Sequence, residues 1–125
     1  MSKPEKILLV DDDDIYLFIA GKTIRKVLPD IDIATCKNGK EAIQRLQKDK
    51  PNILFLDLNM PVMNGWSFLD ELKKKEQELG FPIIIVTSSI DYDDKERAKS
   101  FDFVKGYIEK PLNESKMQEH LLSRN

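Results

Sequence analysis

Three aspartates stand directly after strongly apolar stretches of this 125-residue chain. Asp57 follows residues 53–56, and Asp11 and Asp12 follow residues 6–10. An ionised carboxylate beside a buried strand is costly unless a cation or a hydrogen-bond donor meets it. Hard divalent cations take oxygen ligands, so Asp11 and Asp12 are candidate metal ligands. Asp57 needs a cationic partner from elsewhere in the chain.

Asp13 and Asp14 extend the acidic run, and a plainer interpretation makes these residues the start of a helix. Aspartate is favoured at the N-cap and near the positive end of the helix dipole. Capping needs only one or two acids. It therefore explains Asp13 or Asp14 and leaves Asp11 and Asp12 to the metal hypothesis.

Polar residues also follow the later apolar stretches. Thr87 and Ser88 come after residues 81–86, and Lys110 comes after residues 104–109. Taken singly, the hydroxyls can cap a helix and the lysine can be a solvated charge. Together they suit a phosphoryl group in transfer, because an ammonium group and a divalent ion stabilise its oxygens. Asp57 would then be the nucleophile.

The hydrophobic pattern predicts the elements that position these residues. Strands are predicted at residues 6–10, 31–36, 53–56, 81–86 and 104–109, and helices at 15–28, 38–47, 66–79, 91–100 and from 113 onwards. Asn38 and Asn113 are the predicted N-caps of the second and the last helix. The last strand is the weakest and is expected at the sheet edge. Alternating strands and helices with short loops indicate a parallel α/β sheet covered on both faces. The carboxyl ends of its strands share one edge, so the polar residues can converge there.

Composition narrows the class of protein. The apolar fraction of 41% and charged fraction of 34% are typical of a soluble globular chain, expected here to be one domain over residues 1–125 with no output domain. A net charge of −2 argues against direct nucleic-acid binding, and no apolar run is long enough for a bilayer. Cys36 alone excludes an internal disulfide and suggests the cytoplasm. His120, the only histidine, is interpreted as a surface or packing residue.

In their order and spacing these pieces resemble the response-regulator receiver domains of bacterial two-component signalling, over essentially the full chain. The matching pieces are Leu9-Val10-Asp11-Asp12, Leu56-Asp57-Leu58-Asn59-Met60-Pro61 with Asn64-Gly65, Val86-Thr87-Ser88 and Tyr107-Ile108-Glu109-Lys110-Pro111. The resemblance implies a flavodoxin-like (βα)5 sandwich with strand order 2-1-3-4-5.

The resemblance also implies roles for single residues. Asp57 would accept a phosphoryl group from a histidine kinase or phosphotransfer protein in a Mg²⁺-dependent reaction. The Mg²⁺ ligands would be Asp11, Asp12, Asp57 and the backbone carbonyl of Asn59. The phosphoryl group would contact Lys110, Thr87 and Ser88, and the Lys110–Pro111 bond would be cis.

Further residues would make the domain a switch. Thr87 and Tyr107 would change conformation on phosphorylation, and Asn59 and Ser89 would tune the access of water. The signal would leave through the fourth helix, fifth strand and fifth helix, towards a partner protein or a second copy. That surface is expected around Tyr92, Lys95, Phe103, Tyr107 and Lys116. The expected protein is thus a stand-alone phosphoacceptor and not an enzyme that turns over an external substrate.

The sequence departs from the family pattern in three places, and two alternative functions compete with this interpretation. Residues 101–104 lack the glycine that the family often has, Asn64 replaces a frequent aspartate, and the stretch between Gly65 and Phe81 is slightly long. One rival is a phosphohydrolase of the haloacid-dehalogenase type, which needs a carboxylic general acid where Asn59 stands. The other is a receiver that binds partners without phosphorylation, which the complete set of charged site residues disfavours.

Overall fold

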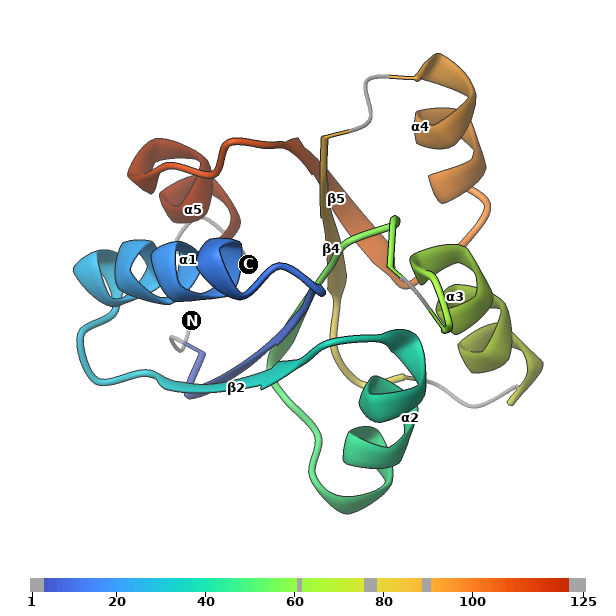
Figure 1. Ribbon diagram of the computed structural model, residues 1–125, viewed down its shortest axis with the longest axis horizontal. Coiled ribbons are helices and arrows are strands. Elements are labelled where there is room, and N and C mark those ends of the chain that lie inside the picture. Colours follow the sequence, from blue (N-terminus) through green and yellow to red (C-terminus); the bar gives the residue numbers. More distant parts are fainter. Residues whose placement is uncertain (1–3, 61, 76–78, 89–90, 122–125) are drawn as a thin grey trace.

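Five strands alternate with five helices in the computed structural model, which describes residues 4–60, 62–75, 79–88 and 91–121 (Figure 1). The strands are β1 (Lys6–Val10), β2 (Asp32–Cys36), β3 (Ile53–Leu56), β4 (Ile83–Thr87) and β5 (Val104–Glu109). The helices are α1 (Asp14–Val27), α2 (Gly39–Lys48), α3 (Gly65–Lys74), α4 (Tyr92–Ala98) and α5 (Glu114–Leu121). The strands form one parallel sheet in the order β2-β1-β3-β4-β5. The expected flavodoxin-like fold is confirmed, with β5 at an edge.

The sheet is buried on both faces because its central strands are apolar throughout. All of β3 is buried, and its side chains alternate between two cores. Leu54 and Leu56 belong to the core under α2, α3 and α4, whereas Ile53 and Phe55 belong to the core under α1 and α5. Figure 1 shows the same division, with α1 and α5 together on one side of the sheet. The result is a three-layer sandwich.

Side-chain caps begin the helices close to the carboxyl ends of the strands. The Asp13 carboxylate accepts hydrogen bonds from the backbone N–H groups of Ile15 and Tyr16, at 3.0 and 3.2 Å. Asn38 caps α2 through the Glu41 N–H at 2.9 Å. The same interaction begins α3 at Asn64, α4 at Asp91 and α5 at Asn113. The predicted caps at Asp13, Asn38 and Asn113 are confirmed.

One predicted boundary is wrong. The pattern predicted that α3 continues through Leu79 to Gly80, but the helix ends at Lys74 with Lys75 as its C-cap. After Leu72, the next inward positions of a helix would be 75 and 76, which are lysine and glutamate. A further turn would therefore bury nothing, and burial is what stabilises short helices. Leu79 instead packs on the core from the loop.

His120 is a packing residue, as expected. Its ring lies against β5 at Gly106, where a Cβ would come within 2.8 Å of the His120 Cδ2 atom. Its Nδ1 atom lies 3.0 Å from the Lys116 carbonyl oxygen one turn earlier in α5. Of the helices that the structure describes, none is long and apolar enough to cross a membrane.

Candidate functional site

Backbone pairing at one edge of the sheet fixes the positions of the candidate residues. The Asp11 N–H donates to the Cys36 carbonyl at 3.0 Å, and the Asp57 N–H donates to the Val10 carbonyl at 2.9 Å. These bonds hold both aspartates at the ends of adjacent strands. Asp11 is 1% exposed and Asp57 is 6% exposed. Two carboxylates are therefore buried side by side and need positive charge nearby.

Asp12 adds a third carboxylate to this pair. One carboxylate oxygen from each of Asp11, Asp12 and Asp57 lies within 4.8 Å of the other two. All three donors are oxygens, and two are buried while Asp12 is exposed, which leaves the cluster open to solvent on one side. This donor set fits a hard divalent cation that keeps some of its water, as Mg²⁺ does. The predicted fourth ligand, the Asn59 carbonyl, stays a prediction.

Lys110 supplies a positive charge from the protein itself. Its ammonium Nζ lies 2.8 Å from Oδ2 of Asp11, and its side chain is 22% exposed. The backbone N–H of Lys110 donates to the Thr87 carbonyl at 2.9 Å, which fixes the start of the loop after β5. The Lys110–Pro111 bond is cis, as the resemblance implied. Lys110 therefore points into the acidic cluster and not into bulk water.

The electrostatics of Asp57 follow from this crowding. Burial, followed by the negative charge of Asp11, raises the pKa of Asp57 from 3.8 to about 6. The Lys110 ammonium and the backbone N–H groups of Asn59 and Leu58 act in the opposite direction, but they do not compensate fully. A further cation would favour the ionised carboxylate. The site is thus suited to a bound divalent ion.

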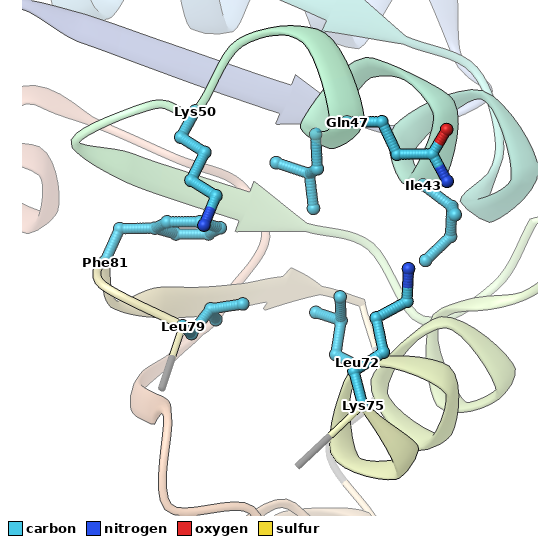
Figure 2. Close-up of a pocket in the computed structure, with 8 residues that line it drawn as sticks. Ile43, Gln47, Lys50, Leu72, Lys75, Leu79 and Phe81 are labelled. Carbon is cyan, nitrogen blue, oxygen red and sulfur yellow. The ribbon is translucent and has the colours of Figure 1, made fainter. Parts of the chain in front are cut away.

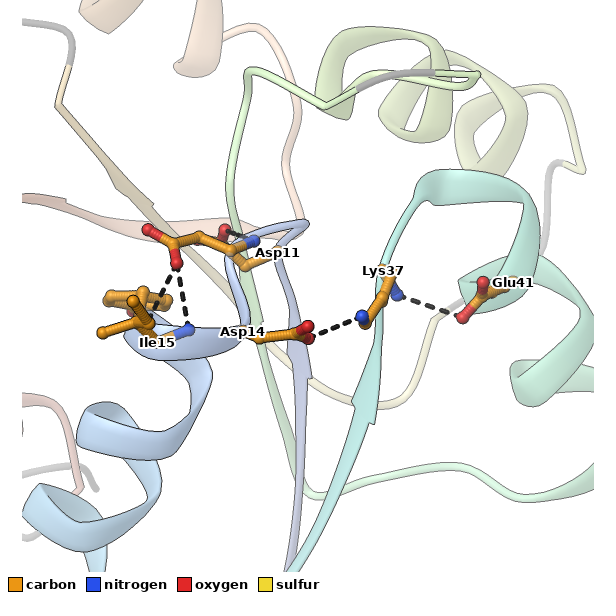
Figure 3. Close-up of polar contacts among 7 residues, drawn as sticks. Asp11, Asp14, Ile15, Lys37 and Glu41 are labelled. Carbon is orange, nitrogen blue, oxygen red and sulfur yellow. Dashed lines mark hydrogen bonds and ion pairs between the residues drawn. The ribbon is translucent and has the colours of Figure 1, made fainter.

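The four consecutive aspartates differ in their contacts, and Figure 3 shows those of Asp11 and Asp14. Asp11 accepts a hydrogen bond from the Asp13 N–H at 2.9 Å, and Asp13 caps α1. Asp14 forms an ion pair with Lys37 at 2.6 Å, and the Lys37 N–H donates to Glu41 at 3.1 Å. Asp13 and Asp14 therefore anchor the loop. Asp11 and Asp12 stay the predicted metal ligands of the run.

Two glycines bring the loop after β3 close to Asp57. The Gly65 N–H donates to the Leu58 carbonyl at 3.0 Å. A Cβ at Gly65 would lie 2.5 Å from the Asp57 carbonyl oxygen, so any side chain there would displace the backbone of Asp57. Gly39 donates to the Met63 carbonyl at 2.9 Å, which ties the far end of the loop to α2. Pro61, part of the stretch that resembles receiver domains, lies outside the described residues.

Tyr16 is the site residue that the sequence analysis missed. Its ring lies under the Lys110 ammonium, with 4.1 Å between Nζ and the ring centroid. Burial, with smaller contributions from Asp11 and Asp57, raises the pKa of its hydroxyl, which therefore stays protonated. A signal was present, since Tyr16 lies four residues before Ala20 and eight before Ile24, on the buried face of α1. Its contact with Lys110 could not be predicted, because Lys110 comes from the other end of the chain.

The remaining predicted residues lie at different distances from this cluster. Thr87 is 0% exposed at the end of β4, next to Lys110, and Ser88 is exposed just beyond it. Tyr107 is half-buried on β5, with the Lys95 ammonium 5.8 Å from its ring centroid. Ser89 lies outside the described residues. Thr87 thus lies at the same edge of the sheet as the acidic cluster, bonded through its carbonyl to Lys110, and Tyr107 faces α4.

Comparisons with known proteins decide the family. The model of the response regulator receiver domain matches residues 7–122. A two-component response regulator from Cytophaga hutchinsonii shares the fold with a TM-score of 0.86 and 31% identity, over 94% of each chain. The chemotaxis response regulator CheY4 of Vibrio cholerae gives a TM-score of 0.78 and 26% identity, over 92% of this chain and 93% of that one. The chain belongs to the response regulator receiver family.

Curated relatives of this receiver domain include longer proteins. A protein-glutamate methylesterase/protein-glutamine glutaminase of Treponema denticola is 39% identical over 84 residues, which are 66% of this chain and 22% of that protein. The chain thus spans about a fifth of the length of the methylesterases it matches. A probable methanogenesis regulatory protein, FilR2 of Methanothrix harundinacea, is 28% identical over 116 residues, 88% of this chain and 74% of that protein.

The described part of the receiver domain has cavities away from the acidic cluster. The first, of about 250 Å³, lies between α2, α3 and the start of β4 (Figure 2). Its walls are Ile43, Leu46, Gln47, Lys50, Leu72, Lys75, Leu79 and Phe81. Lys50 and Phe81 precede β3 and β4, so this cavity lies at the opposite edge of the sheet from Asp57. The described residues that line it include no carboxylate or hydroxyl for phosphoryl chemistry.

The second cavity is a groove of about 470 Å³ between α4 and β5. Tyr92, Lys95 and Tyr107, which belong to the predicted output surface, line it. Phe103 and Lys116 do not: Phe103 packs on Phe101 with 5.8 Å between ring centroids, and the Lys116 ammonium donates to the carbonyls of Glu109 and Pro111. The groove therefore includes only three of the five residues predicted for the output surface.

Proposed function

We propose that this receiver domain is a phosphorylation-dependent switch in which Asp57 accepts a phosphoryl group from the phosphohistidine of a histidine kinase or phosphotransfer protein. A carboxylate oxygen of Asp57 would attack phosphorus, the P–N bond would break, and the imidazole would leave with a proton from solvent. The observation that carries the proposal is the buried Asp57 carboxylate within 4.8 Å of two others, next to an ammonium group. Family membership supports the same chemistry.

Asp11, Asp12, Asp57 and the Asn59 carbonyl are the residues proposed to hold Mg²⁺. A bound magnesium ion would neutralise charge on the phosphoryl oxygens as a Lewis acid. The chain's own contribution is to hold the Asp57 carboxylate at the sheet edge, beside the other two carboxylates and near the Lys110 ammonium. Lys110 would turn from Asp11 towards a phosphoryl oxygen, and the Thr87 and Ser88 hydroxyls would donate to the others.

The phosphoryl group would then shift the domain between two states. Thr87 would move towards it, and Tyr107 would follow on the neighbouring strand. The groove between α4 and β5 supports this output route, because Lys95 on α4 lies 3.1 Å from Glu109 on β5 and faces the Tyr107 ring. A change at Tyr107 would alter the surface that a partner protein or a second copy meets.

Three finer expectations remain predictions. The domain is expected to act on its own phosphoryl group and not as a turnover enzyme, and Asn59 at the position of the general acid supports this over the hydrolase. The expected stand-alone form is testable by the mass of the protein isolated from its own cells. Its cytoplasmic location is testable by fractionation.

The decisive experiment is phosphorylation by acetyl phosphate with Mg²⁺, followed by intact mass spectrometry. We expect one added phosphoryl group, which is lost in Asp57→Asn and in reactions with a chelator. Asp70→Asn, on the exposed face of α3, is the matched control and should be labelled normally. Multiple turnover of acetyl phosphate with no adduct would indicate the hydrolase, and neither adduct nor turnover would indicate a receiver that works without phosphorylation.

Beryllofluoride tests the output. A change in oligomeric mass on its addition would favour a second copy as the partner at the α4–β5 groove. An unchanged oligomeric mass, together with altered backbone hydrogen exchange at Tyr107, would favour a different protein as the partner.

A further inference from the structure

The ammonium of Lys110 lies between a carboxylate and an aromatic face. Asp11 Oδ2 is 2.8 Å from Nζ, and the centroid of the Tyr16 ring is 4.1 Å from it. The three groups come from the end of β1, the first turn of α1 and the loop after β5. The lysine therefore has two independent contacts that decide where its charge is held.

The contact with Tyr16 is the shortest of its kind among the described residues. The other cation–aromatic contacts range from 4.3 Å, between Arg97 and Trp66, to 5.8 Å, between Lys95 and Tyr107. Such contacts are stronger when the cation is partly removed from water, and the Lys110 side chain is mostly buried. The interaction therefore contributes to the position of Lys110 and is not an incidental surface contact.

An aromatic face suits a lysine that must change partner. The ring attracts the ammonium through its quadrupole and carries no formal charge. A carboxylate in the same place would neutralise the ammonium and compete with a phosphoryl oxygen for its N–H donors. The ring can hold the lysine in both states, whereas Asp11 must release it.

The ring and not the hydroxyl makes this contact. The Tyr16 hydroxyl oxygen is buried and makes no hydrogen bond to any residue that the structure describes. The ring packs on the core under α1 and α5, which fixes its plane. Only the aromatic face is in a position to act on Lys110.

We propose that Tyr16 is a positioning residue that holds the Lys110 ammonium over the acidic cluster through its ring during phosphoryl transfer to Asp57. This inference rests on the proposed function. It predicts that a side chain of similar size without a ring loses the effect, and that the hydroxyl is dispensable.

The test measures the rate of phosphorylation by acetyl phosphate at saturating Mg²⁺. Tyr16→Leu should lower the rate by about threefold to tenfold, the range for a partly desolvated cation–aromatic contact. Tyr16→Phe should stay within about twofold of the unsubstituted protein, because a phenyl ring gives nearly the same interaction. Phe18→Leu is the control, since Phe18 lies on the same helix but contacts Lys22 and not Lys110. Tyr16→Met replaces the leucine variant if that variant does not fold.

A double-mutant cycle separates positioning from a general structural role. In a Lys110→Ala background, Tyr16→Leu should have no further effect on the rate, because the residue through which it acts is gone. An equal loss in both backgrounds would overturn the inference, as would an unchanged rate in Tyr16→Leu. A loss in Tyr16→Phe as large as in Tyr16→Leu would assign the role to the hydroxyl and also overturn it. Failure of the unsubstituted protein to take up phosphate would instead refute the proposed function.

Discussion

Lys110 and Asp11 form an ion pair of 2.8 Å although 99 residues separate them along the chain. In the sheet, β3 and β4 lie between the strands that carry them. The loop after β5 and the Lys110 side chain together therefore span the ends of these two strands, which lead into Asp57 and Ser88. In the proposed mechanism this placement would let one ammonium group serve Asp11 in one state and a phosphoryl group on Asp57 in the other.

Removal of the Lys110 charge should destabilise the protein at neutral pH. Lys110→Met leaves the buried Asp11 carboxylate without its cation, and the free energy of unfolding should fall by about 1–3 kcal/mol. Urea unfolding at pH 7 with a chelator present measures it. Lys105→Met on the exposed side of β5 is the control and should change stability by less than about 0.5 kcal/mol. Equal stability of the two variants would show that the ion pair has no net effect.

The pH dependence of stability should carry the signature of Asp57. Its folded pKa of about 6 lies above the ordinary 3.8, so the folded state binds this proton more tightly than the unfolded state. Its contribution to stability is therefore greatest below about pH 4 and is lost as the pH rises through 6. Asp57→Asn should remove this dependence and stabilise the metal-free protein at pH 7 by about 1–3 kcal/mol. No gain at pH 7, or a gain that is equal at pH 4, would refute the assignment.

Neighbouring aspartates should differ in metal binding. Asp12→Asn removes one of the three clustered carboxylates, and Mg²⁺ affinity should fall by about tenfold or more. Asp14→Asn lies two residues away but breaks only the ion pair with Lys37, so its affinity should stay within about threefold. Isothermal titration with MgCl₂ at pH 7 compares them. Similar losses in both variants would place the metal elsewhere in the acidic loop.

Two glycines should be required for different reasons. Gly65→Ala places a Cβ 2.5 Å from the Asp57 carbonyl oxygen, so it should cost about 2 kcal/mol or more and slow phosphorylation. Gly80 has φ 85° with open space around it, so Gly80→Ala should cost only the backbone strain of about 1 kcal/mol. Its phosphorylation rate should not change. Thermal unfolding and acetyl phosphate kinetics on both variants distinguish steric displacement from strain.

Local patterns were sufficient for much of the fold. Residues 53–56 and 81–86 are apolar without interruption because both faces of a central strand are buried, and this property is visible in the sequence. Asn38 and Asn113 could be assigned as caps because a cap acts within three residues. The order of the strands could not be predicted from local patterns, because it depends on how the crossover connections pack. It came from the resemblance to receiver domains.

The wrong end of α3 and the missed residue Tyr16 have the same cause. Both depend on tertiary contacts, which a local sequence pattern does not show. The end of α3 at Lys74 depends on what the next turn could bury, not on the apolar Leu79 that suggested continuation. Tyr16 has a clear position on its helix, but its meaning comes from Lys110, which arrives from the other end of the chain. The convergence of Asp11, Asp57 and Lys110 was predictable because parallel strands share an edge. The exact position of the Lys110 ammonium, beside Asp11 and over the Tyr16 ring, was not predictable.

The central claim is that Asp57 is the nucleophile, and the most direct measurement locates the acyl phosphate itself. After reaction with acetyl phosphate and Mg²⁺, borohydride reduction converts an aspartyl phosphate into homoserine, which peptide mass spectrometry can place. We predict homoserine at position 57 alone, and none without Mg²⁺. Homoserine at Asp11 or Asp12, or phosphate uptake that persists in Asp57→Asn, would contradict the account.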